Sequence, residues 1–326
     1  MIDYTYFYKQ KFSIVENLSE LGHYDLFISS FLDIERVKEP SLNIDRNEEL
    51  WFVLERDTSN LFLQNKRLVI LEMNNDYQKI MDAIKSIELA GKRICVDATG
   101  FSIHYLLFLI RVLYYLGVKK FDVIYTEPQK YKNDEETEFS NKFDYVTQIT
   151  GMSGSHTSET ENDLLIIAAG YDHGRIVDVA NSKKHATKAL LFGFPSISPG
   201  MFQENILRAY KAEPAVGSDC FNDMGRNIYA PAYDPFVAAQ AIQDYIEHCR
   251  KLLKKEKGAL ADFTNIYLAP LSTKPHALGM ALYFMWERGW RNNITLLYPL
   301  CHEYHADNSV GIARIWNYKF ELPEYV

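Results

Sequence analysis

The sequence has few cysteines, and none of them stand in a CxxC spacing. Its four cysteines lie far apart in the chain, at positions 95, 220, 249 and 301. This usage excludes a disulfide framework and a zinc ribbon, and it is typical of proteins kept in a reducing cytosol. The first residues, Met1 to Tyr6, lack the basic and apolar regions of a secretory signal. We therefore expect a cytoplasmic protein.

Long apolar runs and an excess of positive charge are also absent. The longest apolar run spans residues 103–117, contains His104 and Arg111, and is too short to cross a bilayer. It predicts instead a helix that is buried on nearly all sides. With 35 Lys and Arg against 43 Asp and Glu, the net charge is −8. This balance argues against a general nucleic-acid surface and against a membrane-binding surface, because both require basic patches.

Three sequence signatures of common enzymes are missing as well. The chain contains no GxSxG elbow, no GxGxxG fingerprint and no Walker A loop, so α/β-hydrolase and dinucleotide dehydrogenase assignments lose their usual support. Cys301, His302 and His305 gather side chains that bind metals, but the HExxH spacing is absent and no third ligand can be named. The sequence therefore predicts no metal site, and it names no cofactor.

What recurs along the 326 residues is a short apolar strand, a polar turn and a helical pattern. Strands that alternate with helices in this way predict a mainly parallel sheet covered on both faces. The length and the 47% hydrophobic fraction allow a large core. The expected fold class is α/β, with two Rossmann-like units of mainly parallel sheet flanked by helices on both faces.

A polar stretch, residues 129–163, separates the two halves of the sequence and is rich in charged residues, Ser, Thr and Gly. Loops of this length are usually linkers or functional lids. We place a domain boundary here, which gives an N-terminal unit of residues 1–150 and a C-terminal unit of residues 151–326. A lid within one domain is the alternative. Residues 311–322 alternate roughly in polarity and are expected to form a closing edge strand.

The segment from Asp97 to His104 ends one predicted strand and starts the buried helix. Ligands of open parallel sheets bind beyond the carboxyl ends of the strands. Thr99, Gly100 and Ser102 offer hydroxyls and a closely turning backbone beside free helix N–H groups, an arrangement that holds phosphate or ribose. An ordinary capped turn, in which Asp97 satisfies backbone donors, explains the pattern equally well. His104 is interpreted first as a packed histidine, and as a proton carrier if the site is catalytic.

Glu127 stands at the end of the next predicted strand, in Tyr125-Thr-Glu-Pro128. Both strands of this crossover deliver acidic groups to the same edge of the sheet, so Asp97 and Glu127 are the candidate catalytic carboxylates. Glu127 would act as a general base or bind ribose hydroxyls. A structural ion pair with a neighbouring Lys or Arg is the alternative.

The turn before the predicted helix at Lys274 is the most suggestive ligand-binding sequence. Ser272, Thr273 and Lys274 place two hydroxyls and a cation at a helix N-terminus, the arrangement that an anion prefers. A surface turn with a solvated lysine is the alternative. Gly170, in the turn after another predicted strand, and His276 complete the predicted ligand-binding residues.

The order of a strand, Ser272-Thr-Lys274 and a small-residue helix resembles the Thr-Gly-Gly-Thr-Lys-type turn of CARF domains, with Leu271 and Ser272 in place of the glycine pair. CARF domains are Rossmann-like sensors of cyclic oligoadenylates in CRISPR-linked immunity. Asp97-Ala-Thr-Gly100 resembles the same kind of turn. Tyr24-Asp-Leu-Phe-Ile-Ser-Ser30 is similar to the opening strand of TIR and related nucleotide-sensing or NAD-processing domains. The resemblances imply a role in bacterial antiphage defence, and the CARF likeness implies a homodimer with the ligand across its twofold interface.

Three functions remain open on the sequence. The leading hypothesis is a protein that binds or senses a nucleotide-derived anion. The second is an enzyme that cleaves or transfers a group from a nucleotide, of the NAD glycohydrolase or nucleotide hydrolase type. The third is a subunit of a defence complex whose partner is another protein. Fold alone does not choose among them.

Overall fold

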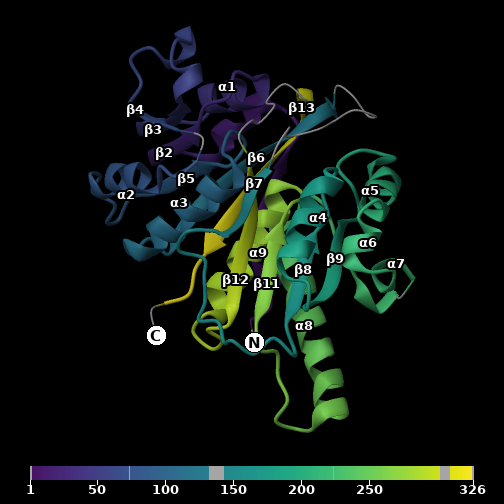
Figure 1. Ribbon diagram of the computed structural model, residues 1–326. Helices are drawn as coiled ribbons and strands as arrows, with labels where there is room; N and C mark the ends of the chain where they lie inside the picture. The colour runs from purple at the N-terminus through teal and green to yellow at the C-terminus, as the bar shows by residue number, and fades with distance from the viewer. Residues whose placement is uncertain (1, 73, 132–142, 223, 302–308, 325–326) are drawn as a thin grey trace. The chain divides into compact units, whose positions relative to one another are not determined.

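The structure is a computed structural model that describes residues 2–72, 74–131, 143–222, 224–301 and 309–324 (Figure 1). The chain forms two compact units, each assembled from separate stretches of sequence. The first unit contains Phe7–Lys142 and His302–Tyr325, and the second contains Met1–Tyr6, Phe143–Cys301 and Val326. The start of the chain therefore belongs to the second unit, which is built mainly from the C-terminal half. Residues 309–324, near the end of the chain, belong to the first unit, which is built mainly from the N-terminal half.

The first unit is built on a seven-stranded sheet with the order β1-β13-β6-β5-β2-β3-β4. The five strands from β6 to β4 are parallel, and β13 and β1 complete the sheet in antiparallel pairing. The strands are β1 (Lys9–Phe12), β2 (Tyr24–Ser30), β3 (Arg46–Leu54), β4 (Leu68–Leu71), β5 (Ile94–Asp97), β6 (Lys120–Tyr131) and β13 (Ser309–Glu321).

Helices cover both faces of this first sheet. The strands β3 and β4 lie on one side of β2, and β5 and β6 lie on the other. Because crossovers between parallel strands keep one hand, crossovers in opposite directions place their helices on opposite faces. One face packs Phe27, Trp51 and Ile124 against Val37 of α1. On the other face Phe52 contacts Phe101, which precedes α3, and α2 packs beside α3. The helices are α1 (Glu35–Leu42), α2 (Tyr77–Lys85) and α3 (Ile103–Tyr115), with short 3-10 turns η1 (Tyr4–Tyr6), η2 (Val15–Leu21), η3 (Glu55–Asp57) and η4 (Leu61–Leu63), of which η1 belongs to the second unit.

The second unit is built on a six-stranded sheet with the order β10-β9-β8-β11-β12-β7. The five strands from β10 to β12 are parallel, and β7 pairs antiparallel with β12 at the edge. The strands are β7 (Phe143–Gln148), β8 (Leu164–Ala168), β9 (Thr187–Gly193), β10 (Asn227–Ala230), β11 (Ile266–Pro270) and β12 (Ile294–Cys301).

The helices of the second unit also form two layers. The helices between β8 and β10 form one group, in which α4 contacts α5 and α6, whereas α8 and α9 pack closely against each other (Figure 1). Residues 2–6 join this unit through Tyr4, whose backbone N–H donates to Gln240 Oε1 at 3.0 Å. The helices are α4 (His173–Ser182), α5 (Met201–Tyr210), α6 (Glu213–Val216), α7 (Asp219–Asn222), α8 (Pro235–Lys257) and α9 (Lys274–Glu287), with the 3-10 turn η5 (Met224–Arg226).

Local sequence explains where the longest helix begins and ends. Asp234 caps α8, because its Oδ1 accepts hydrogen bonds from the backbone N–H groups of Phe236 and Val237 at 3.1 and 3.2 Å. Pro235 fits the first helical position, where no N–H is needed. The helix ends at Gly258, whose φ of 107° is strained for other residues.

A polar network, partly exposed at residues 155–159, attaches residues 154–159 to the amino ends of β11 and β12. His156 bridges two side chains, with Nε2 at 2.7 Å from Thr295 Oγ1 and Nδ1 at 3.1 Å from Asn265 Oδ1. Asn265 Oδ1 also accepts from the Thr157 N–H at 3.1 Å, while Asn265 Nδ2 donates to Asp163 Oδ1 at 2.7 Å. Asn265 and Thr295 are fully buried, so this network fixes the loop that leads into β8.

The α/β class and the two Rossmann-like units are confirmed, and three expectations differ in detail. The strand expected at 311–322 is not a closing edge strand, because β13 lies between β1 and β6. The polar stretch 129–163 contains the end of β6 and all of β7, while residues 132–142 lie outside the described part. A division at residue 150 does not accommodate residues 2–6 and β7, which belong to the second unit, or β13, which pairs with β6 in the first unit.

Candidate ligand-binding site

The two parallel sheets share one topological feature that places a candidate site in each unit. In the first sheet the strand order reverses between β2 and β5, and in the second it reverses between β8 and β11. Ligands of open α/β sheets bind outside the carboxyl ends of the strands at such switch points. The predicted site residues lie near the carboxyl ends of the strands in both sheets. They are Asp97, Thr99, Gly100, Ser102, His104 and Glu127 in the first unit, and Gly170, Ser272, Thr273, Lys274 and His276 in the second.

In the first unit, hydrogen bonds within the protein engage the polar groups at the end of β5. Asp97 is fully buried, and its carboxylate accepts from the Thr99 N–H at 2.9 Å and from Ser29 Oγ at 3.2 Å. Thr99 Oγ1 in turn accepts from the Thr126 N–H at 3.0 Å. These contacts stabilise the turn and tie β2, β5 and β6 together, as expected for a capped structural turn.

Gly100, Ser102 and His104 continue this turn into α3. A Cβ atom on Gly100 would lie 1.7 Å from the carbonyl oxygen of Ser30, so the turn is pressed against the end of β2. Ser102 occupies the N-cap position, and within the described chain its buried Oγ has no hydrogen-bond partner. The His104 ring is almost completely buried, with its centroid 6.1 Å from that of Tyr77. The switch point of the first sheet is closely packed.

Glu127 lies on β6 and is completely buried. Its Oε1 accepts from the Trp316 indole N–H at 2.8 Å, and its Oε2 lies 3.1 Å from Arg314 Nε. Burial raises the pKa of Glu127 above its ordinary value, although Trp316, Arg314 and Lys11 favour the charged form. The structure therefore places Glu127 in the ion pair that was the alternative to a site role, with a carboxyl that holds its proton more tightly than usual.

In the second unit, the turns that follow β8 and β11 touch directly. A Cβ atom on Gly170 would lie 2.0 Å from the carbonyl oxygen of Leu271, so only glycine permits this approach. Asp172, two residues further, caps α4 by accepting from the Arg175 N–H at 3.3 Å. The switch point of the second sheet therefore brings together the loops that lead into α4 and α9.

The turn before α9 combines two anchored residues with two that are partly exposed. Thr273 Oγ1 donates to the Ala232 carbonyl at 2.6 Å and accepts from the His276 N–H at 3.4 Å. Ser272 and Lys274 are partly exposed on either side of Thr273. Within the described part of the chain, the Ser272 hydroxyl makes no hydrogen bond. An exposed hydroxyl and a lysine therefore stand at the N-terminus of a helix of 14 residues.

His276 supports this turn from inside the protein. It is fully buried, and its Nε2 lies 3.1 Å from the Pro231 carbonyl oxygen, so Nε2 carries the proton. Burial lowers the pKa of His276 to about 4, and its ring is therefore neutral at neutral pH. The residue positions the α9 turn against the loop after β10 rather than presenting a charge to solvent.

Sequence reasoning missed the aromatic residues at the same edge of the second sheet. Phe194 follows β9, Phe202 lies in the first turn of α5, and Tyr229 lies in β10. The ring centroids of Phe194 and Phe202 are 4.8 Å apart, and those of Phe202 and Tyr229 are 6.1 Å apart. Phe194 stands in a turn that the sequence marks as a strand end, but the three residues come from separate segments that no local pattern connects.

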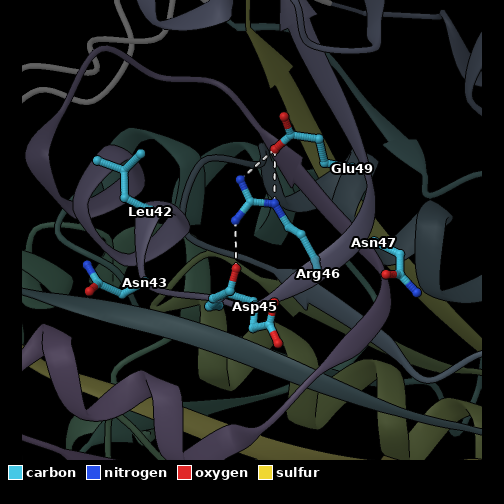
Figure 2. Close-up of a pocket in the computed structure, with 7 residues that line it drawn as sticks. Leu42, Asn43, Asp45, Arg46, Asn47 and Glu49 are labelled. Atoms are coloured by element: carbon cyan, nitrogen blue, oxygen red, sulfur yellow. Dashed lines mark hydrogen bonds and ion pairs between the residues drawn. The ribbon is translucent and has the colours of Figure 1, made fainter.

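A surface pocket of about 530 Å³ lies at the amino end of β3, away from the carboxyl edge of that sheet (Figure 2). Figure 2 shows the Arg46 guanidinium directed at Glu49, with N–O distances of 3.1 and 2.7 Å, and Arg46 also donates to the Ile44 carbonyl at 2.7 Å. Burial opposes ionisation of Glu49, but hydrogen bonds from Trp51, Arg46 and Lys66 outweigh it and lower the Glu49 pKa. The charged groups of this pocket are thus already paired.

The described residues also bear on metal binding and on membrane insertion. Among them, no group of three or more His, Cys, Asp or Glu side chains is placed to hold a metal ion. His302 and His305, the metal-competent pair of the sequence, lie outside that part. Within the same ranges, no helix has the length and apolar character needed to span a membrane.

Strand order and helix layers define a mixed α/β protein with two Rossmann-like units. No protein-family model matches the chain, and no curated protein matches it. Among solved structures, it is similar to "CobK precorrin-6A reductase", with a TM-score of 0.26 and 8% sequence identity, over 86% of this chain and 90% of that one. A likeness at this level assigns no function.

Proposed function

We propose that the protein binds a small nucleotide-derived anion at the turn between β11 and α9. The supporting observation is the pair of partly exposed residues, Ser272 and Lys274, at the N-terminus of α9 beside a topological switch point. The positive end of the helix dipole, a hydroxyl and a lysine each favour a phosphate or another oxyanion. Thr273 and His276 hold this turn in place.

The proposal is one of binding or sensing rather than consumption of the ligand. The groups at the α9 turn are hydroxyls and a lysine, which bind negative charge, and residues 271–276 contain no acidic side chain. The nearest acidic side chain on the β8 turn, Asp172, already caps α4. The resemblance of Ser272-Thr-Lys274 to CARF domains supports a sensor in bacterial antiphage defence, acting as a homodimer, with a protein partner as the alternative role.

The direct test is titration calorimetry with NAD, ATP, GTP, cyclic dinucleotides and cyclic oligoadenylates, followed by chromatography of each sample. Lys274→Ala should weaken binding by about 1–3 kcal/mol, because it removes a charge-assisted contact. Lys251→Ala is the matched control, since Lys251 is an exposed lysine on α8 of the same unit. Equal affinity in wild type and Lys274→Ala would remove this turn from the site, and conversion of a ligand would identify an enzyme instead.

A further inference from the structure

The aromatic side chains at the ends of β9 and β10 form a cluster that we name the aromatic platform, consisting of Phe194, Phe202 and Tyr229. Buried Phe192 supports it from within the sheet, with ring centroids 6.4 Å from Phe202 and 6.2 Å from Tyr229. α5 lies beside β9 and contributes Phe202 (Figure 1). The platform thus has a fixed apolar base.

Its outer members are open to solvent. Phe194 is 54% exposed and Tyr229 is 40% exposed, although both contact ring neighbours. Packing of α5 onto the sheet is already achieved by Phe202 against Phe192, and it does not require a phenyl ring on the surface at Phe194. Two half-exposed aromatic rings held by a buried base each present a ring face on which another planar ring can stack.

The aromatic platform is connected to the α9 turn through a short chain of hydrogen bonds. The Phe194 N–H donates to the Ala230 carbonyl at 2.8 Å, and the Ala232 N–H donates to the Pro195 carbonyl at 2.9 Å. The Ala232 carbonyl accepts the Thr273 hydroxyl at 2.6 Å. Because only β8 separates β9 from β11, these two strands lie about 10 Å apart. The hydrogen bonds place the backbone that follows Phe194 beside the loop that anchors Thr273.

We propose that the aromatic platform stacks the nucleobase of the ligand whose phosphates bind at the α9 turn. The inference rests on the proposed function and narrows its ligand class to nucleotides that carry both a free base face and an anionic group. Base stacking on aromatic side chains tolerates different bases, so Phe194 supplies affinity for a base without selecting one.

The test is calorimetric titration of the full chain with ADP and with inorganic pyrophosphate, which lacks the base. Wild-type protein should bind ADP at least about fivefold more tightly than pyrophosphate, since stacking contributes at least that much per base. Phe194→Ala should lose most of this advantage while its pyrophosphate affinity stays unchanged. Phe194→Leu, which keeps an apolar side chain, should lose it as well and guards against a folding defect.

Tyr210→Ala is the matched control. Tyr210 is 57% exposed on the same helix as Phe202, but its ring contacts Phe221 rather than the aromatic platform. It should leave both affinities unchanged. Equal wild-type affinities for ADP and pyrophosphate, or an ADP affinity that survives Phe194→Ala and Phe194→Leu, would overturn the inference and leave the anion site standing. Absence of binding by either probe would overturn the proposed function itself.

Discussion

Burial separates the predicted site residues into two kinds. Asp97 and His276 are fully buried and are bonded to neighbouring backbone or side-chain groups, so their polarity stabilises turns. Ser272 and Lys274 keep part of their surface in solvent, next to a helix N-terminus. The sequence pattern is the same in both cases, a polar residue after a buried strand. Only the surrounding packing decides whether such a residue is buried in a turn or remains open to solvent.

The burial of Glu127 predicts how the stability of the fold depends on pH. Its folded-state pKa is raised, so its contribution to stability is complete below the ordinary value of 4.5 and is lost as pH rises through the folded pKa. Glu127→Gln removes this titration. Urea unfolding measured from about pH 4 to about pH 7 should show the wild type losing stability relative to the variant. Parallel stability curves for the two proteins would contradict the raised pKa.

At the scale of helices and strands, apolar runs between turn residues were enough to predict most elements. α9 begins at Lys274 as predicted, and α3 (Ile103–Tyr115) lies in the apolar run 103–117 for which a buried helix was predicted. β1 was missed because Lys9–Phe12 has one buried residue in four, and β7 was missed because it lies in a polar stretch. Both are edge strands, in which one side of the backbone and many side chains face water, so they leave a weak hydrophobic signal.

The network around Asn265 makes a prediction for the loop that precedes β8. Asn265→Ala removes the acceptor for His156 and for the Thr157 N–H, and it should destabilise the fold by about 2 kcal/mol because the buried Asp163 carboxylate also loses the Asn265 donor. Hydrogen exchange should then show faster exchange of the Thr157 amide. Asn292→Ala is the control, since it removes one exposed contact with Ser155. An unchanged Thr157 exchange rate would show that the network does not hold this loop.

At the scale of the whole molecule, the sequence predicted the type of sheet but not which segments share one. Parallel pairing with helices on both faces follows from alternating elements, and it is present in both units. The place of β13 depends on pairing with β6 over residues that are nearly 200 positions away, such as Trp316 with Tyr125. The aromatic platform likewise depends on three separate segments. Contacts of this range leave no local pattern, whereas the Ser272–Lys274 turn is contiguous and was predictable.

The central position of β13 predicts how each unit responds to its loss. A chain that ends at Cys301 lacks the strand that pairs with both β1 and β6. The first unit should lose hydrogen-exchange protection in β5 and β6, while β8 and β11 of the second unit keep theirs. The full-length chain measured alongside is the reference. Retained protection of β6 in the shortened chain would show that β13 is dispensable for the first sheet.

The position of β13 also bears on the order in which the two units mature during synthesis. A ribosome completes residues 143–301 before it adds Ser309–Glu321. The second unit therefore has its whole sheet available first, although most of its sequence follows that of the first unit. Residues 7–131 must wait with β6 exposed along one edge until the last strand emerges. Unpaired edges of this kind attract other strands, so a nascent chain paused before residue 309 is the state most exposed to mispairing and to capture by chaperones.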